Sequence, residues 1–442
     1  MAEQIGPGYR GVFAVGEFRA VFAAHVLSIL GEVLCGIALS VLVYRSTGSP
    51  LLSALSLAVG MLPYLLGGTL LASVAERFPA RRVLVVCDLC SCVCALGLLL
   101  PAAPVGALLG LRAAMAAVSP VFSGTRMGSL GEVLGSGDAF VLGRSAIRIT
   151  SQAGQLAGFG AGGLLLAVLP PRAVLATTAA GFLGSALVLR FGTPARPARA
   201  AGDTGAEATA PGAAKGTAIR PGLIGQSLGG VRELAASPRV RALLLLAWVP
   251  PAFVCVPESL LTAYAARLGI GTGGLGVLMC GMPIGAVLGE TLVGSRLGPA
   301  WRARLTLPVA VGAMLPALGY ALRPGLGAAL ACQLLTGCGI AYTLGLDQRF
   351  VAAVPERLRG ASMTLLTAGL MTGQGLAMAV AGTVAEWVPV PAAMAGGGVL
   401  GLLCTGTVAW RVRSAERGTR PWGGGRTTRR PRRRPGPRPR AV

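Results

Sequence analysis

The feature that most constrains this chain is a series of twelve long apolar stretches separated by short polar segments. Most of them reach the roughly 20 residues that an α-helix needs to cross about 30 Å of hydrocarbon. Only 12% of the residues are charged, against about 25% in an average soluble domain. The sequence therefore predicts an all-α membrane protein with twelve transmembrane helices, over residues 20–43, 51–74, 83–100, 104–123, 149–169, 173–189, 242–265, 273–295, 305–322, 325–346, 361–385 and 388–410.

A polar segment rich in Pro, Ala and Gly follows the sixth stretch and divides the twelve into two sets of six. Its composition is typical of a flexible linker. The Arg-rich end of the chain is expected either to be free in solvent or to lie against anionic lipid headgroups. We expect a six-helix bundle at 1–191, a cytoplasmic linker at 192–239, a second six-helix bundle at 240–411 and a basic disordered tail at 412–442.

The basic residues predict the orientation of the chain in the membrane. Short cytoplasmic loops carry an excess of Lys and Arg. Of the 39 basic residues, four fall in predicted outer loops: Arg45, Arg172, Arg267 and Arg323. We therefore place both termini in the cytoplasm, and the excess of Arg over Lys is typical of a GC-rich bacterial genome, which indicates a bacterial cytoplasmic membrane. The net charge of +23 is then mainly a topology signal, and no folded module for nucleic acid accompanies it.

Single residues limit the kinds of catalytic and cofactor site that the chain can form. The one lysine, Lys215, is followed by Gly216, so the chain lacks the Gly-Lys-Ser/Thr of a phosphate-binding loop. The one histidine, His25, lies inside the first apolar stretch. Four cysteines share one apolar run without a second pair of metal ligands: Cys87, Cys90, Cys92 and Cys94. We expect no catalytic residues, no metal and no cofactor.

Two ionisable residues lie near the middle of predicted helices, where a charge costs about 2.5–3.5 kcal/mol. Glu32 is about 18 Å from the inner end of the first helix, and Arg112 is about 12 Å from the outer end of the fourth. These depths match, so the two side chains pair if their helices are neighbours. We predict that Glu32 alternates between a proton and Arg112, because a carboxylate in a low-dielectric site binds a proton more readily once its cation leaves. The alternative is a permanent salt bridge that fixes the helices together.

Other polar residues in the predicted helices have different expected roles. His25 shares a helix face with Glu32, so it either continues the proton path or packs as a hydrogen-bonded residue. Gln374, near the middle of the eleventh helix, is expected to contact substrate. Four acidic residues lie nearer to helix ends and are expected at gates or interfaces: Asp88, Glu258, Glu290 and Asp347.

The loop between the second and third helices resembles a signature of the major facilitator superfamily, G-x-x-x-D-R-x-G-R-R. Its residues here are Ala72, Glu76, Arg77, Pro79, Arg81 and Arg82. Ala72, Glu76 and Pro79 depart from the signature. The resemblance implies a cytoplasmic gate latch formed by Glu76, Arg77, Arg81 and Arg82, with Asp88 nearby. It also implies two six-helix bundles around a central cavity.

Two further helices resemble motifs of the same superfamily. Leu108, Arg112 and Met115 match L-x-x-x-R-x-x-Q-G, a motif implicated in proton coupling, with Met115 in place of Gln. This implies that Met115 faces the substrate cavity together with Gln374. The fifth helix resembles the antiporter motif G-x-x-x-G-P-x-x-G-G, with Phe159 in place of Pro; its glycines are Gly154, Gly158, Gly162 and Gly163.

The chain also resembles actinobacterial drug-efflux members of the superfamily in its N-terminal runs around Phe18 and Val43. This resemblance implies proton-coupled efflux, by antiport, of a small amphipathic compound or drug. The expected partners are a small-molecule substrate, protons and the lipid bilayer, with a monomer as the working unit. An importer or uniporter of the same fold, and a membrane sensor that transports nothing, are the alternatives.

Overall fold

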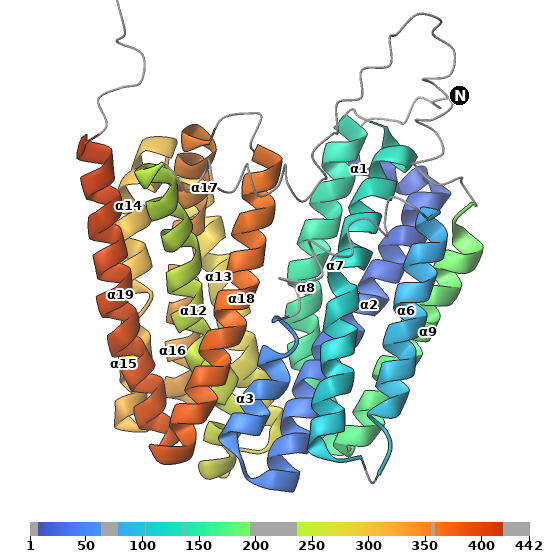
Figure 1. The fold of residues 1–442 in the computed structure, drawn as a ribbon, viewed down its shortest axis with the longest axis horizontal. Coiled ribbons are helices and arrows are strands. Elements are labelled where there is room, and N and C mark those ends of the chain that lie inside the picture. The colour runs from blue at the N-terminus through green and yellow to red at the C-terminus, as the bar shows by residue number, and fades with distance from the viewer. Residues whose placement is uncertain are drawn as a thin grey trace, which may run out of the picture.

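The computed structural model shows an all-helical chain folded into two bundles that lie side by side (Figure 1). No strand occurs in the part of the chain that the structure describes. This part comprises residues 8–62, 78–101, 103–135, 138–194, 237–354 and 359–418.

The N-terminal bundle contains the longest helix, α2 (Gly16–Thr47). A short helix at the N-terminus precedes six helices that pack together. Their bounds are α1 Gly8–Ala14, α2 Gly16–Thr47, α3 Pro50–Ala58, α6 Ala80–Gly97, α7 Val105–Leu134, α8 Asp138–Val168 and α9 Pro171–Gly192.

The C-terminal bundle is built in the same way, with two of its membrane segments interrupted. The ninth segment breaks into three short pieces near Pro316, and the tenth breaks at Ile340 and Ala341. The bounds are α12 Pro238–Arg267, α13 Thr272–Arg296, α14 Pro299–Gly312, α15 Leu315–Leu318, η1 Gly319–Leu322, α16 Leu326–Gly339, α17 Tyr342–Ala353, α18 Arg359–Trp387 and α19 Val390–Gly418.

Nine helical stretches within the described residues are long and apolar enough to cross a membrane. Three of the twelve predicted segments are not among these nine. Half of the second segment, residues 63–74, falls outside the described part, and the third and fifth segments correspond to α6 and α8. Large apolar side chains point outward around both bundles, as lipid-facing residues do; they include Val93, Leu164, Phe191, Leu322, Leu403 and Trp410.

Parts of the predicted domain boundaries lie outside the described residues, namely 195–236 of the linker and 419–442 of the tail. At the C-terminal boundary the structure differs from the expectation. Helix α19 continues to Gly418, so the predicted start of a disordered tail at residue 412 falls inside a helix.

The two bundles are joined at the end of the molecule remote from α1 and from the C-terminal end of α19 (Figure 1). One apolar cluster there includes residues of both bundles, among them Leu39 and Leu261. Close contact is possible because two glycines face each other, Gly163 of α8 and Gly276 of α13. A Cβ atom added to either would approach the other's backbone more closely than real Cβ atoms do. Ser40 also bonds to Thr262 across the bundles, with 3.0 Å between the hydroxyl oxygens.

A carboxylate from one bundle caps a helix of the other at this joined end. Glu386, at the C-terminal end of α18, accepts hydrogen bonds from the hydroxyl of Ser49 and from the backbone N–H of Leu51 at 3.0 Å. Ser49 is the N-cap of α3, whose first N–H groups lack partners within their own helix. A negative charge there is stabilised by the helix dipole. Glu386 therefore links the two bundles through these hydrogen bonds.

Replacing Glu386 by Ala should loosen the start of α3. We expect hydrogen–deuterium exchange of the backbone amides in α3 to become several-fold faster, because their capping acceptor and its charge are lost. Glu416→Ala is the matched control: its carboxylate pairs with Arg349 at 2.8 Å inside the C-terminal bundle and should leave α3 unchanged. Equal exchange in the two variants would show that Glu386 does not hold α3.

Candidate functional site

A large cavity lies between the two bundles, with a volume of about 530 Å³. Its wall takes side chains from α2, α3, α7 and α8 on one side and from α12, α13, α17 and α18 on the other. The break between α16 and α17 also faces it through Ile340. Irregular backbone at membrane depth is tolerated where it lines a cavity. The cavity is thus built by both halves of the chain together.

Glu32 of α2 and Arg112 of α7 meet on the wall of this cavity, as their matching depths predict. Arg112 Nη2 lies 3.9 Å from Glu32 Oε1. The Arg112 side chain is buried, whereas 30% of the Glu32 side chain is exposed. Within the described residues, Arg112 Nε has no hydrogen-bond partner. This distance is longer than that of a hydrogen-bonded bidentate ion pair. Arg112 and Glu32 can therefore separate without breaking such a pair.

The two residues predicted to face substrate have different places. Gln374 lines the cavity, and its Nε2 donates to Cys255 Sγ at 3.2 Å. Met115 is 3% exposed and packs in the apolar core instead. It is not among the described residues that line the cavity. The direction of Met115 depends on the rotation of α7 about its axis, which the motif alone does not fix.

Glu258 lines the same cavity from α12, which differs from the expected place near a gate or interface. The helix continues beyond the predicted outer end to Arg267, so Glu258 lies about 14 Å from that end. Three prolines lie inside this helix: Pro250, Pro251 and Pro257. The sequence signal for this position is that Glu258 is an ionisable residue inside a membrane helix, directly after Pro257. Such residues almost always face the interior of a bundle or a cavity.

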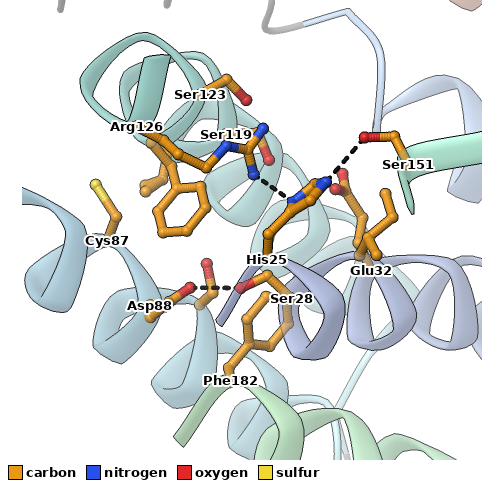
Figure 2. Close-up of a pocket in the computed structure, with 14 residues that line it drawn as sticks. His25, Ser28, Glu32, Cys87, Asp88, Ser119, Ser123, Arg126, Ser151 and Phe182 are labelled. Carbon is orange, nitrogen blue, oxygen red and sulfur yellow. Dashed lines mark hydrogen bonds between the residues drawn. The ribbon is translucent and has the colours of Figure 1, made fainter. Parts of the chain in front are cut away.

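A second, smaller pocket of about 200 Å³ lies inside the N-terminal bundle (Figure 2). Its wall carries His25, Asp88 and Arg126, together with several serines. Glu32 lines this pocket as well as the central cavity. The carboxylate of Glu32 is therefore the ionisable group that the two pockets share in the described part of the chain.

His25 is held between two polar groups in this second pocket (Figure 2). A guanidinium nitrogen of Arg126 contacts His25 Nδ1. Because arginine has no acceptor, Nδ1 accepts, and a neutral ring then carries its proton on Nε2. Nε2 donates to Ser151 Oγ at 2.8 Å, and Ser151 donates to the carbonyl of Ile147 at 2.9 Å. The orientation of His25 is thus fixed at both ring nitrogens.

Asp88 was expected beside the cytoplasmic gate loop, and the structure instead buries it in this pocket at 2% exposure. It accepts a hydrogen bond from Ser28 at 3.0 Å and a second from Ser185. Of the gate-loop residues, Arg81 donates to the carbonyl of Thr193 at 3.0 Å and Arg82 is exposed. Glu76 and Arg77 lie outside the described residues.

The motif glycines of α8 serve two contacts. Gly154, Gly158 and Gly162 face Ile29, Val33 and Ile37 of α2, and a Cβ added at any of them would crowd those side chains. Gly163 instead contacts the other bundle at Gly276. Small residues of this kind permit close packing of membrane helices. The first three glycines thus allow α8 to pack closely against α2, the helix that carries Glu32. Gly163 allows the two bundles to meet at the joined end.

The family model of the Major Facilitator Superfamily matches residues 21–353, which is most of the chain. The chain belongs to the major facilitator superfamily. It is therefore a multi-pass membrane protein and a secondary transporter, of a class that is not enzymatic. No curated protein sequence matches this transporter.

Solved structures of low sequence identity share the fold of this transporter. PepTSo, a POT family transporter, is 13% identical, with a TM-score of 0.68 over 93% of this chain and 100% of that one. The xylose transporter XylE from E. coli, in an inward-open conformation, is 14% identical, with a TM-score of 0.63 over 91% and 99%. A bacterial homologue of the human lysosomal transporter Spinster, inward-facing and unoccupied, is 16% identical, with a TM-score of 0.59 over 90% and 94%. These similarities establish the twofold bundle architecture.

The serine bonds of Asp88 should be important for the stability of the transporter. Replacing Ser185 by Ala removes a donor from a buried carboxylate, which costs about 1–3 kcal/mol. We expect a lower thermal unfolding midpoint of the purified protein. Ser56→Ala is the control, because its buried hydroxyl bonds only to the nearby carbonyl of Ser53. Equal midpoints for the two variants would show that Asp88 does not depend on Ser185.

Proposed function

We propose that this transporter exports a small amphipathic compound across a bacterial cytoplasmic membrane in exchange for protons. The observation that carries the proposal is the position of Glu32, which lines both pockets and lies 3.9 Å from Arg112. One carboxylate can then respond to the occupant of the central cavity and to a proton that arrives through the N-terminal bundle.

In the proposed cycle, Glu32 is either protonated or paired with Arg112. Protonation releases Arg112, whose Nε already lacks a partner among the described residues. A buried cation without its counter-charge is costly, so Arg112 and the helix that carries it rearrange. This couples the proton to the conformation of the bundles. His25, which Arg126 and Ser151 hold beside Glu32, is proposed to continue the proton path.

The moving units are proposed to be residues 1–191 and 240–411, joined by a cytoplasmic linker at 192–239. With both termini in the cytoplasm, the contacts at Gly163, Ser40 and Glu386 close the outer end. The cavity is then accessible from the cytoplasm, where an exporter loads its cargo. Rocking of one bundle against the other would open the outer end. One chain supplies the whole wall of the cavity, which supports a monomer as the working unit.

The energy of the proton gradient suffices for this work. One charge that moves through 100 mV yields about 2.3 kcal/mol, and one pH unit adds about 1.4 kcal/mol. Together they sustain a concentration ratio of a few hundred-fold for each proton.

The test is accumulation of a panel of antibiotics and dyes in a pump-deficient bacterial host, with and without an uncoupler. The proposal predicts that expression of the transporter lowers accumulation of at least one compound, and that the uncoupler restores it. Raised accumulation would overturn export in favour of import. Lowered accumulation that resists the uncoupler would overturn proton coupling.

A further inference from the structure

The central cavity has an excess of negative charge. Of the described residues that line it, Arg112 is the one cation, whereas Glu32 and Glu258 are both carboxylates. Arg112 pairs with Glu32. Glu258 makes no ion pair within the described residues, so the wall has one carboxylate more than it has cations.

In the part of the chain that the structure describes, no cation and no hydrogen-bond donor contacts the Glu258 carboxylate. The amide of Gln374, which also lines the cavity, donates from its Nε2 to Cys255 Sγ rather than to the carboxylate. A carboxylate at membrane depth is costly without a counter-charge. The cavity that Glu258 faces is therefore the place where a positive group gains most from binding.

A second buried polar group on the same wall also lacks a protein partner. The Tyr342 side chain is 4% exposed, and its hydroxyl has no hydrogen bond in the described part of the chain. Buried polar atoms normally have hydrogen-bond partners, so this hydroxyl is available to a polar group of a ligand that reaches it. Tyr342 comes from α17 and Glu258 from α12, and both residues line the cavity.

The apolar residues of the wall determine which kind of cation the cavity can bind. Five methionines line it: Met61, Met279, Met282, Met371 and Met378. Methionine is flexible and polarizable and adapts to apolar ligands of different shapes. Such a wall offers little to a hydrated inorganic ion, and the volume suits a drug-sized molecule. Only Phe159 and Tyr342 among the described lining residues are aromatic, so charge recognition falls to the carboxylate rather than to an aromatic cage.

We propose that the central cavity binds lipophilic organic cations of single charge, with Glu258 as their counter-ion. The bulk of the ligand packs against the methionines, and its charge replaces the missing partner of Glu258. Glu32 and Arg112 remain free for the proton. This inference rests on the proposed function only in taking the central cavity as the transport site.

The experiment measures equilibrium binding to the purified full-length protein in lipid nanodiscs, with no gradient imposed. The probes are tetraphenylphosphonium and tetraphenylborate, which have the same shape and opposite charge. Wild type should bind the phosphonium about ten-fold or more tightly than the borate, and Glu258→Gln should lose about ten-fold or more in phosphonium affinity. Glu416→Gln, outside the cavity, is the control and should match wild type.

Three outcomes overturn the inference: wild type that does not prefer the phosphonium, Glu258→Gln that keeps full phosphonium affinity, and Glu416→Gln that loses it equally. If Glu258→Gln does not fold, Glu258→Asp is the second variant, since it keeps the charge and must keep the preference. Because binding is measured without a gradient, selective binding together with absent proton-driven transport would refute the proposed coupling and leave this inference standing.

Discussion

Glu32→Gln should leave a transporter that exchanges substrate across the membrane but no longer concentrates it. The amide cannot take up a proton and cannot form the charged pair with Arg112, which lies 3.9 Å away in the wild type. In proteoliposomes with an imposed gradient of about one pH unit, one-for-one antiport sustains about a ten-fold concentration ratio. The variant should reach a ratio of about one, while exchange of labelled for unlabelled substrate continues, because exchange needs no net proton movement.

The control for this variant is Glu17→Gln, which removes a carboxylate from the first turn of the same helix, outside both pockets. It should concentrate substrate as the wild type does. Full pH-driven accumulation by Glu32→Gln would show that another group carries the proton. Loss of exchange as well as accumulation would show that Glu32 serves binding or folding rather than coupling.

Gly163→Leu should slow every mode of transport strongly, including exchange. Gly163 faces the backbone of Gly276 in the other bundle, and an added Cβ atom already meets that backbone. A leucine side chain at this contact would hold the joined end apart, so that the transporter cannot reach the conformation in which that end is closed. We expect the exchange rate to fall about ten-fold or more, because a barrier increase of about 1.4 kcal/mol suffices for that factor.

A matched change tests whether this effect belongs to the contact. Gly110 of α7 is exposed, and a Cβ added there meets nothing within 4 Å. Gly110→Leu should therefore exchange substrate at the wild-type rate. Wild-type exchange by Gly163→Leu, with normal expression and unfolding temperature, would exclude this glycine contact from the transport cycle.

The elements that the sequence could predict are those that depend on length and hydrophobicity. Apolar stretches of membrane-spanning length identified the helices, and the fixed rise of an α-helix put Glu32 and Arg112 at one depth. Helix ends were less well predicted, because helices continue beyond the apolar part. The apolar pattern predicts that the fourth helix ends at residue 123, but α7 continues to Leu134. Arg126 was thereby assigned to a loop, although it is buried beside His25.

The directions of individual side chains could not be predicted from the sequence alone. Depth along a helix does not fix rotation about its axis, so Met115 was expected in the cavity and packs in the core. Asp88 was expected near a helix end, but it is the ninth of the 18 residues of α6 and faces the serines of α2 and α9 rather than a gate. Three prolines lie inside α12, and the place of Glu258 on the cavity wall depended on packing between helices that no single segment contains.

The central claim, that export is exchange for protons, is tested most directly by the pH inside proteoliposomes. The purified transporter is reconstituted with a lumenal pH indicator and no imposed gradient, and a compound identified in cells is added outside. The account predicts that inward movement of the compound drives protons outward, so that the lumen becomes more alkaline. The change should vanish with a protonophore and with Glu32→Gln. Movement of the compound at the wild-type rate with no change in lumenal pH would contradict it.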